Sequence, residues 1–205
     1  MPPRRSIRFP LKGYLTMGMT PLDLCSRALL KIGAGTITSF DEGTLEAEVA
    51  ANLYPAARDA LLSSHPWNFA IAQADLLRLV KRPTADFEYA FQLPPDCLRV
   101  LSAGTGGRGS GLRYRIYARQ VHCDADEVTL TYICRPREDD FPPFFTMALL
   151  AHLAAEFCIP LTDSTARWEG MRNLAEAEFR RAKLIDAQED TAPQITDFTL
   201  ISERY

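Results

Sequence analysis

The sequence lacks several features that would identify whole classes of protein. No apolar run reaches the roughly eighteen residues that a membrane-spanning helix needs, so we expect no membrane-spanning segment. Residues 1–16 have neither a continuous apolar stretch nor a small-residue cleavage site, which argues against a secretory signal. Because the cysteines are odd in number and include no Cys-x-x-Cys pair, we expect reduced and mostly buried thiols. These cysteines are Cys25, Cys97, Cys123, Cys134 and Cys158.

The chain has 205 residues and a net charge of −3. Residues 1–16 contain four basic side chains and no acidic one, so the remainder carries a net charge of −7. Proteins whose affinity for nucleic acid comes from neutralising phosphates present a basic face. The acidic body argues against that class.

Two amphipathic helices are expected in the first third of the chain. Thr20, followed by Pro21 and with Asp23 three residues later, is typical of a helix start, because it combines a capping hydroxyl, a first-turn proline and an acid near the positive end of the helix dipole. A second helical pattern follows and ends before Pro66. We expect a kink at Pro55, since proline removes a backbone donor.

The apolar period changes to two between about residues 84 and 135, which indicates strands. Apolar residues alternate with polar or small ones at 87–91 and again at 128–132. Turn-forming segments separate these runs, including the glycine-rich stretch 103–111. We expect a small antiparallel sheet, with this stretch as a flexible hairpin loop.

Helical periodicity returns after the segment DDFPPFF, residues 139–145. Residues 146–159 are apolar nearly all round, as in a central helix, and we expect this helix to end at Pro160. A solvated amphipathic helix should follow, from about Thr165 to Ala187.

These patterns predict an α+β fold, in which an antiparallel helical bundle is interrupted by a small antiparallel β module and followed by an extended C-terminal tail. The tail is expected to be extended because it has apolar residues without a helical period. The expected divisions are a basic N-terminal arm at 1–18, a helical bundle at 19–78 and 141–188, an inserted β module at 79–140, and the tail at 189–205.

Formal matches to ligand sites have plainer interpretations. Gly104-x-Gly106-x-x-Gly109 matches a dinucleotide fingerprint, but a strand pattern follows it where a phosphate loop needs a helix. His122 and Cys123 could ligate a metal, but adjacent strand residues point to opposite faces, and no second pair stands at zinc-ligand spacing. No signature such as G-x-S-x-G supports nucleophilic catalysis. We therefore expect no metal, no cofactor and no catalytic residue.

The segment HPWNFA, residues 65–70, follows the second expected helix directly. Pro66 disfavours helical geometry at His65 and so ends that helix. Trp67 and Phe69 can each bury on the order of 150–250 Å² where the chain turns. The chemistry favours a packing anchor over a ligand site.

The order of motifs along the chain is more informative than any one of them. The segments are ALLKIGAGTITSFDE, the stretch 54–62 leading into HPWNFA, YAFQLPPDCLRVL, LTYICRPREDDFPPFF and LLAHLAAEFCIPLT. This order resembles that of the bacteriophage head-to-tail adaptors, also called tail tubular protein A or gatekeeper-like connectors, which also occur in gene transfer agents. The likeness covers most of the chain and departs from it at residues 1–16 and Pro55. Its motif residues are His65, Pro66, Trp67, Asn68, Phe69, Leu93, Pro94, Asp96, Leu98 and Arg99.

The resemblance implies a structural, non-enzymatic virion protein, made in the cytoplasm of the host bacterium and located at the head–tail junction. It implies a ring of twelve copies under the portal protein, which continues the DNA channel and offers an attachment surface to a downstream tail or nozzle protein. Double-stranded DNA would pass without sequence-specific binding, and an acidic body suits such a channel.

The resemblance also implies that the C-terminal region reaches toward the portal. A tail that cannot bury its own apolar side chains could become ordered on a partner. We therefore expect residues 189–205 to dock on the portal. The expected portal-binding residues are Ile195, Phe198, Leu200, Ile201 and Tyr205.

Two alternatives stay open. A small metal-dependent enzyme built on His122 and Cys123 would carry stoichiometric metal when purified. A DNA-binding module that uses the basic arm would show steeply salt-dependent DNA binding, and this binding would disappear when residues 1–16 are removed.

Overall fold

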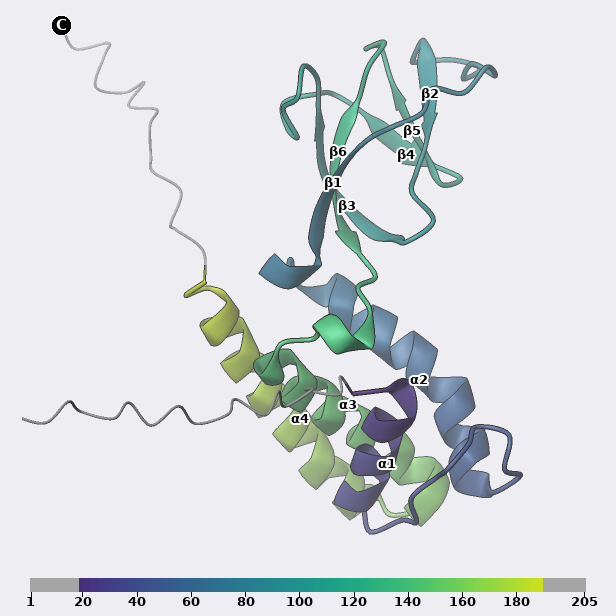
Figure 1. Cartoon of the computed structure of the whole chain (residues 1–205), viewed down its shortest axis with the longest axis vertical. Helices are drawn as coiled ribbons and strands as arrows, with labels where there is room; N and C mark the ends of the chain where they lie inside the picture. Colours follow the sequence, from purple (N-terminus) through teal and green to yellow (C-terminus); the bar gives the residue numbers. More distant parts are fainter. Residues whose placement is uncertain (1–18, 190–205) are drawn as a thin grey trace, which may run out of the picture.

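The computed structural model describes residues 19–189, which form a helical bundle at one end and a β module at the other (Figure 1). The architecture is α+β, as the sequence predicts. The expected N-terminal arm at 1–18 and nearly all of the tail lie outside the described residues. The elements are α1 (Pro21–Lys31), α2 (Leu45–Ser64), η1 (Asn68–Ala70), β1 (Ile71–Asp75), β2 (Tyr89–Gln92), β3 (Cys97–Gly104), β4 (Arg115–Tyr117), β5 (Gln120–Cys123), β6 (Thr129–Cys134), η2 (Glu138–Asp140), α3 (Pro143–Thr162) and α4 (Thr165–Asp186).

Helix α1 begins where its capping residue predicts, and α2 also begins at a capping threonine. The Thr20 hydroxyl accepts the Asp23 N–H at 3.1 Å, and the Asp23 carboxylate accepts the Thr20 N–H at 3.0 Å, so the two residues cap α1 reciprocally. Thr44 caps α2 in the same way as Thr20 caps α1, by accepting the N–H of Ala47. Helix α2 ends before Pro66 as expected, and Pro55 lies inside it without ending it.

Helix α3 is the centre of the bundle, and α1, α2 and α4 all pack against it. Phe145, Leu149, Leu153 and Phe157 on this helix are fully buried. The prediction that α3 ends at Pro160 was wrong, because the helix continues to Thr162. A proline disfavours helical geometry at the preceding residue without forbidding it.

Helix α3 is also long and apolar enough to cross a membrane by length and composition, although polar residues interrupt its apolar run. The most apolar eighteen-residue window of this helix is 61% buried inside the bundle. Its position as the core helix accounts for its apolar character.

The β module contains two three-stranded antiparallel sheets, where the sequence predicted one sheet. Their strand orders are β1-β6-β3 and β2-β5-β4, and they enclose a core that includes Phe91, Val121 and Leu130. The strands begin earlier than the sequence indicated, since β1 lies within the range 19–78 assigned to helices. Strand β1 pairs with β6 in a register that places Ile71 opposite Ile133. Its alternating residues are mostly small or polar, so the apolar period was weak.

The glycine-rich stretch connects the two sheets and does not close a hairpin between paired strands, because β3 pairs with β6 whereas β4 pairs with β5. The stretch is packed against the module. The carbonyl of Gly109 accepts hydrogen bonds from the hydroxyls of Ser102, at 2.6 Å, and Thr131, at 3.1 Å. A Cβ at Gly104 would overlap with the carbonyl oxygen of Arg108. At Gly104 glycine therefore serves for close approach of the backbone, whereas Gly106, Gly107 and Gly111 adopt positive φ angles that favour glycine.

We expect Gly104→Ala to lower the free energy of unfolding by about 1–3 kcal/mol, because the added methyl group would overlap with backbone atoms that cannot move aside. The control is Gly170→Ala in α4, where an added Cβ meets no atom within 4 Å. This control should stabilise the protein by about 0.5–1 kcal/mol, because alanine favours helix. The free energy of unfolding of both variants is measured in urea. An unchanged value for Gly104→Ala would mean that the backbone around residue 104 is not closely packed.

Candidate functional site

The chain passes twice between the bundle and the β module, at residues 65–70 and 134–141, and we call this junction the waist. Trp67 is fully buried there and donates its indole N–H to the carbonyl of Leu61 at 3.2 Å. Four aromatic rings surround it, at centroid distances of 5.2 Å for Phe145, 5.7 Å for Phe179, 6.2 Å for Phe69 and 6.4 Å for Phe144. The HPWNFA segment is thus a packing anchor, as its chemistry predicts.

A buried carboxylate ties the end of α4 to this segment. Asp186 is only 2% exposed, and its carboxylate accepts the backbone N–H of Asn68 at 3.0 Å. The side-chain amide of Asn68 also donates to the Asp186 carbonyl at 2.7 Å. His65 Nε2 lies 3.5 Å from the same carboxylate, and its ring meets Trp67 edge-on. Sequence reasoning missed Asp186, although an acid within the last, largely apolar turn of α4 was a usable signal.

The second motif, Leu93–Arg99, organises the side of the β module that faces the bundle. Leu93 is buried, and the Pro94 carbonyl accepts the Arg119 side chain at 2.8 Å. The Asp96 carbonyl accepts the Arg135 N–H at 2.9 Å. Leu98 packs against the core cluster that contains Trp67, whereas Arg99 is exposed. The two motifs therefore meet at the waist, which the sequence did not reveal.

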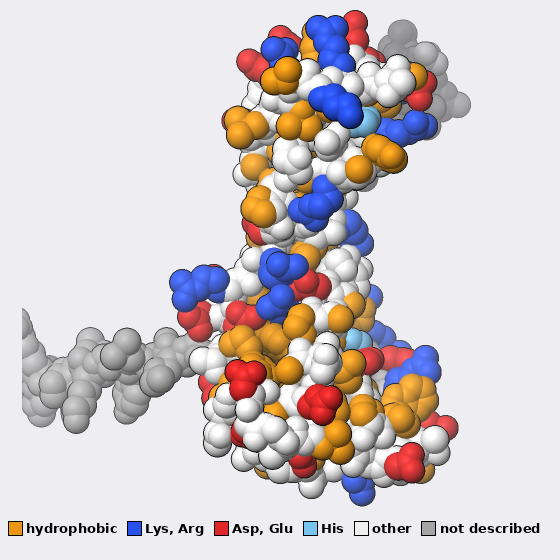
Figure 2. Space-filling model, turned by 90° about the vertical axis from the view of Figure 1, so that its right-hand side faces the viewer, with side chains coloured by type: hydrophobic (Ala, Val, Ile, Leu, Met, Phe, Trp, Pro, Cys, Tyr) orange, Lys and Arg blue, Asp and Glu red, His pale blue; other side chains and the backbone are white. Residues whose placement is uncertain are grey.

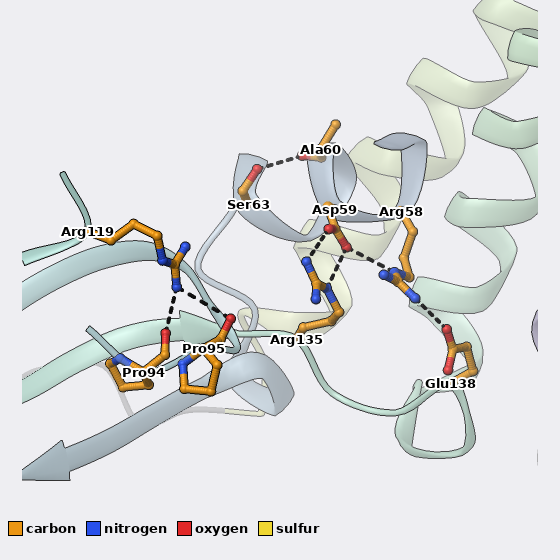
Figure 3. A network of polar contacts seen from close by, with 9 residues as sticks. All are labelled: Arg58, Asp59, Ala60, Ser63, Pro94, Pro95, Arg119, Arg135 and Glu138. Carbon is orange, nitrogen blue, oxygen red and sulfur yellow. Dashed lines mark hydrogen bonds and ion pairs between the residues drawn. The ribbon is translucent and has the colours of Figure 1, made fainter. Parts of the chain in front are cut away.

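A network of charged side chains spans the waist (Figure 3). Asp59 on α2 accepts two hydrogen bonds from Arg135, at 3.0 and 2.6 Å, and one from Arg58 at 3.0 Å. Glu138 accepts from Arg58 at 2.7 Å and from the Tyr54 hydroxyl at 2.9 Å. Burial alone would raise the pKa of Glu138, but the hydrogen bonds from Arg58 and Tyr54 hold it below its usual range. The network fixes the segment after β6 onto α2.

The residues weighed for catalysis or ligand binding do not converge. His122 and Cys123 lie next to each other on β5, where His122 is half-buried beside Gln120 and Cys123 is buried. Within residues 19–189, no group of three or more His, Cys, Asp or Glu side chains could hold a metal ion. Burial raises the pKa of Cys123, and that of Cys25 to about 12, so both remain weakly nucleophilic thiols. The expected portal-binding residues 195–205 lie outside the described residues.

Charge is divided between the two parts of the molecule. Residues 71–135 contain nine basic and seven acidic side chains, a net charge of +2. The described helical residues, 19–70 and 136–189, contain nine basic and sixteen acidic side chains, a net charge of −7. Figure 2 shows one face, with Lys and Arg prominent over the β module and acidic side chains spread over the bundle. The acidity inferred for the body as a whole thus belongs to the bundle.

No protein-family model matches this chain, and no curated protein matches it.

We expect Asp59 and Arg135 to be energetically coupled by about 0.5–1 kcal/mol, because their contact is bidentate and Asp59 is partly buried. The measurement is a double-mutant cycle with Asp59→Ala and Arg135→Ala, read by urea unfolding. The matched control is the Arg172–Glu176 pair on α4, in which both side chains are exposed and coupling should be about 0.3–0.5 kcal/mol. Equal coupling in the two cycles would mean that the Asp59–Arg135 contact does not hold the waist.

His65 should make stability depend on pH. Burial lowers its pKa below the usual 6.5, and nearby Lys183 and Arg99 add to this effect, whereas Asp186 opposes it. Because the unfolded chain takes up the proton first, the contribution of His65 is complete above pH 6.5 and is lost as pH falls from there toward its folded pKa. The free energy of unfolding should therefore fall more steeply below pH 6.5 in the wild type than in His65→Gln. Parallel pH profiles would contradict this assignment.

Proposed function

We propose that the protein is a structural head-to-tail adaptor of a tailed phage or phage-derived particle. Twelve copies would form a ring under the portal, continue the DNA channel and offer the surface to which a downstream tail or nozzle protein attaches. The protein would act in the virion at the head–tail junction and would have no enzymatic activity.

One observation supports this proposal best. The molecule has two chemically different ends, and hydrogen bonds and an ion pair at the waist hold these ends together. A connector must bind one partner at each end and hold the two at a fixed separation. The acidic bundle and the weakly basic β module offer two such surfaces. The Asp186–Asn68 contact and the Asp59–Arg135 pair lie between them.

The positions of the motif residues agree with this proposal. Trp67 and Asn68 of one motif, and Leu93 and Leu98 of the other, contribute to the waist and to the cores beside it. The motifs that resemble those of adaptors thus help to hold the two ends at a fixed separation, which is what a connector needs most.

The acidic bundle also suits a protein that lets DNA pass. Phosphate binding draws on Lys and Arg side chains that displace counterions, and a surface with net negative charge does not attract the duplex. The described helical residues carry a net charge of −7. A channel wall formed from the bundle would therefore allow DNA to slide.

The test is to mix the purified protein with the portal ring encoded by the same genome and to count the subunits in the complex by negative-stain imaging and mass. We expect a twelve-fold collar stacked on the portal. If both proteins are folded and do not associate, the adaptor assignment is wrong.

The docking of the tail is tested by removing residues 189–205. We expect the truncated protein to keep its fold, because the described contacts of the waist end at Asp186, and to lose most of its affinity for the portal. Circular dichroism checks the fold, and sedimentation with the portal ring measures binding. Unchanged affinity would contradict docking through Ile195, Phe198, Leu200 and Ile201.

A further inference from the structure

The helical bundle carries an open apolar groove between α2, α3 and α4, with a volume of about 460 Å³. Its apolar lining includes Leu61, Ala155, Trp168 and Phe179. Two acids, Glu156 and Glu176, and one base, Arg172, are among the lining residues. Glu176 pairs with Arg172 at 3.3 Å, whereas Glu156 is exposed and forms no ion pair within residues 19–189. We call this feature the groove.

The β module carries a protruding counterpart, the loop of residues 77–82, which we call the tip loop. Leu77 is 82% exposed and Val80 is fully exposed, the two highest values among the large hydrophobic side chains described. Three exposed cations, Arg78, Lys81 and Arg82, stand beside them. Two solvent-exposed apolar side chains next to three positive charges are typical of a surface that binds another protein.

The tip loop is held in place before it meets a partner. The Leu79 N–H donates to the Ala90 carbonyl at 2.8 Å, and the Leu77 carbonyl accepts the Gln92 N–H at 3.2 Å, so the loop pairs with the edge of β2. The guanidinium groups of Arg78 and Arg82 stack on the ring of Tyr89 at 5.2 and 5.7 Å. Binding through this loop would therefore cost little ordering entropy.

We propose that the tip loop of one copy inserts Leu77 and Val80 into the groove of a second copy, where its cations face Glu156. The occupant is a second copy because the charges are complementary: the loop carries three cations, and the bundle that holds the groove has a net charge of −7. The apolar side chains of the tip loop in one copy would then contact the apolar lining of the groove in the other copy. This inference rests on the ring assembly proposed above and identifies the surfaces that make the ring contact.

The two surfaces lie on different parts of the molecule, so the contact is heterologous: each copy offers its tip loop to one neighbour and its groove to the other. Such contacts form a closed ring when the rotation between copies closes, and a filament when it does not. In a closed ring, each copy would lean so that its β module lies against the bundle of the next.

The test is cross-linking between two variants that each add one exposed cysteine to the five native ones, Val80→Cys in the tip loop and Ala60→Cys on the wall of the groove. Both positions are exposed. After mixing and mild oxidation, we expect an 80–60 linked dimer in the mixture that neither variant gives alone, identified by peptide mass. Leu45→Cys, at the other end of α2 and 58% exposed, replaces Ala60→Cys as the control and should give no specific link.

A charge reversal tests the complementarity. Arg82→Glu is added to the Val80→Cys variant, and Glu156→Lys to the Ala60→Cys variant. Each reversal alone should lower the yield of the 80–60 link by about fivefold, as expected for a loss of roughly 1 kcal/mol in binding free energy. Together the two reversals should restore the yield. Failure of this rescue would overturn the pairing of the cations with Glu156.

The experiment is run on the free protein at high concentration and on complexes with the portal. Rings on the portal without an 80–60 link, or with residue 80 linked to the portal or to another protein, would overturn this inference and leave the adaptor function standing. An 80–60 link in a protein that does not bind the portal would support the contact and contradict the adaptor function.

Discussion

The burial of one carboxylate, that of Asp186, is the constraint on which the two-part architecture depends. A carboxylate removed from water is costly unless hydrogen-bond donors reach it, and the Asn68 N–H and the His65 ring approach it at the waist. Asn68 stands immediately before the segment that leads into β1, so holding it also sets the direction in which the β module leaves the bundle. Trp67 fills the aromatic core beside it.

A fixed waist allows the chain to keep two different surfaces apart. The bundle has a net negative charge and an apolar groove, whereas the β module presents exposed apolar side chains among cations. The adaptor function and the contact between copies are two consequences of the same arrangement, in which each end is free to bind a partner.

Local signals in the sequence predicted the parts of the fold that are determined locally. The Thr20 cap and Pro66 set helix boundaries through contacts within a few residues, and the apolar segment 146–159 indicated a central helix. The rest depends on long-range contacts. Strand β1 is recognisable only by its pairing with β6, and the structural role of Asp186 follows from its contact with Asn68, 118 positions away. The stretch 103–111 was interpreted as a flexible hairpin loop because Gln73 and Thr131, against which Gly109 packs, are distant in sequence.

The most direct test of the account is whether the waist holds the two ends at one separation. Spin labels on Leu45→Cys at the end of the bundle and Tyr117→Cys on β4 report this separation by pulsed electron resonance, because both positions are exposed. If the waist is rigid, the distance between the two labels has a single narrow distribution in the free protein. A broad or multiple distribution would contradict it, because a connector that bends at the waist cannot hold two partners at a fixed spacing.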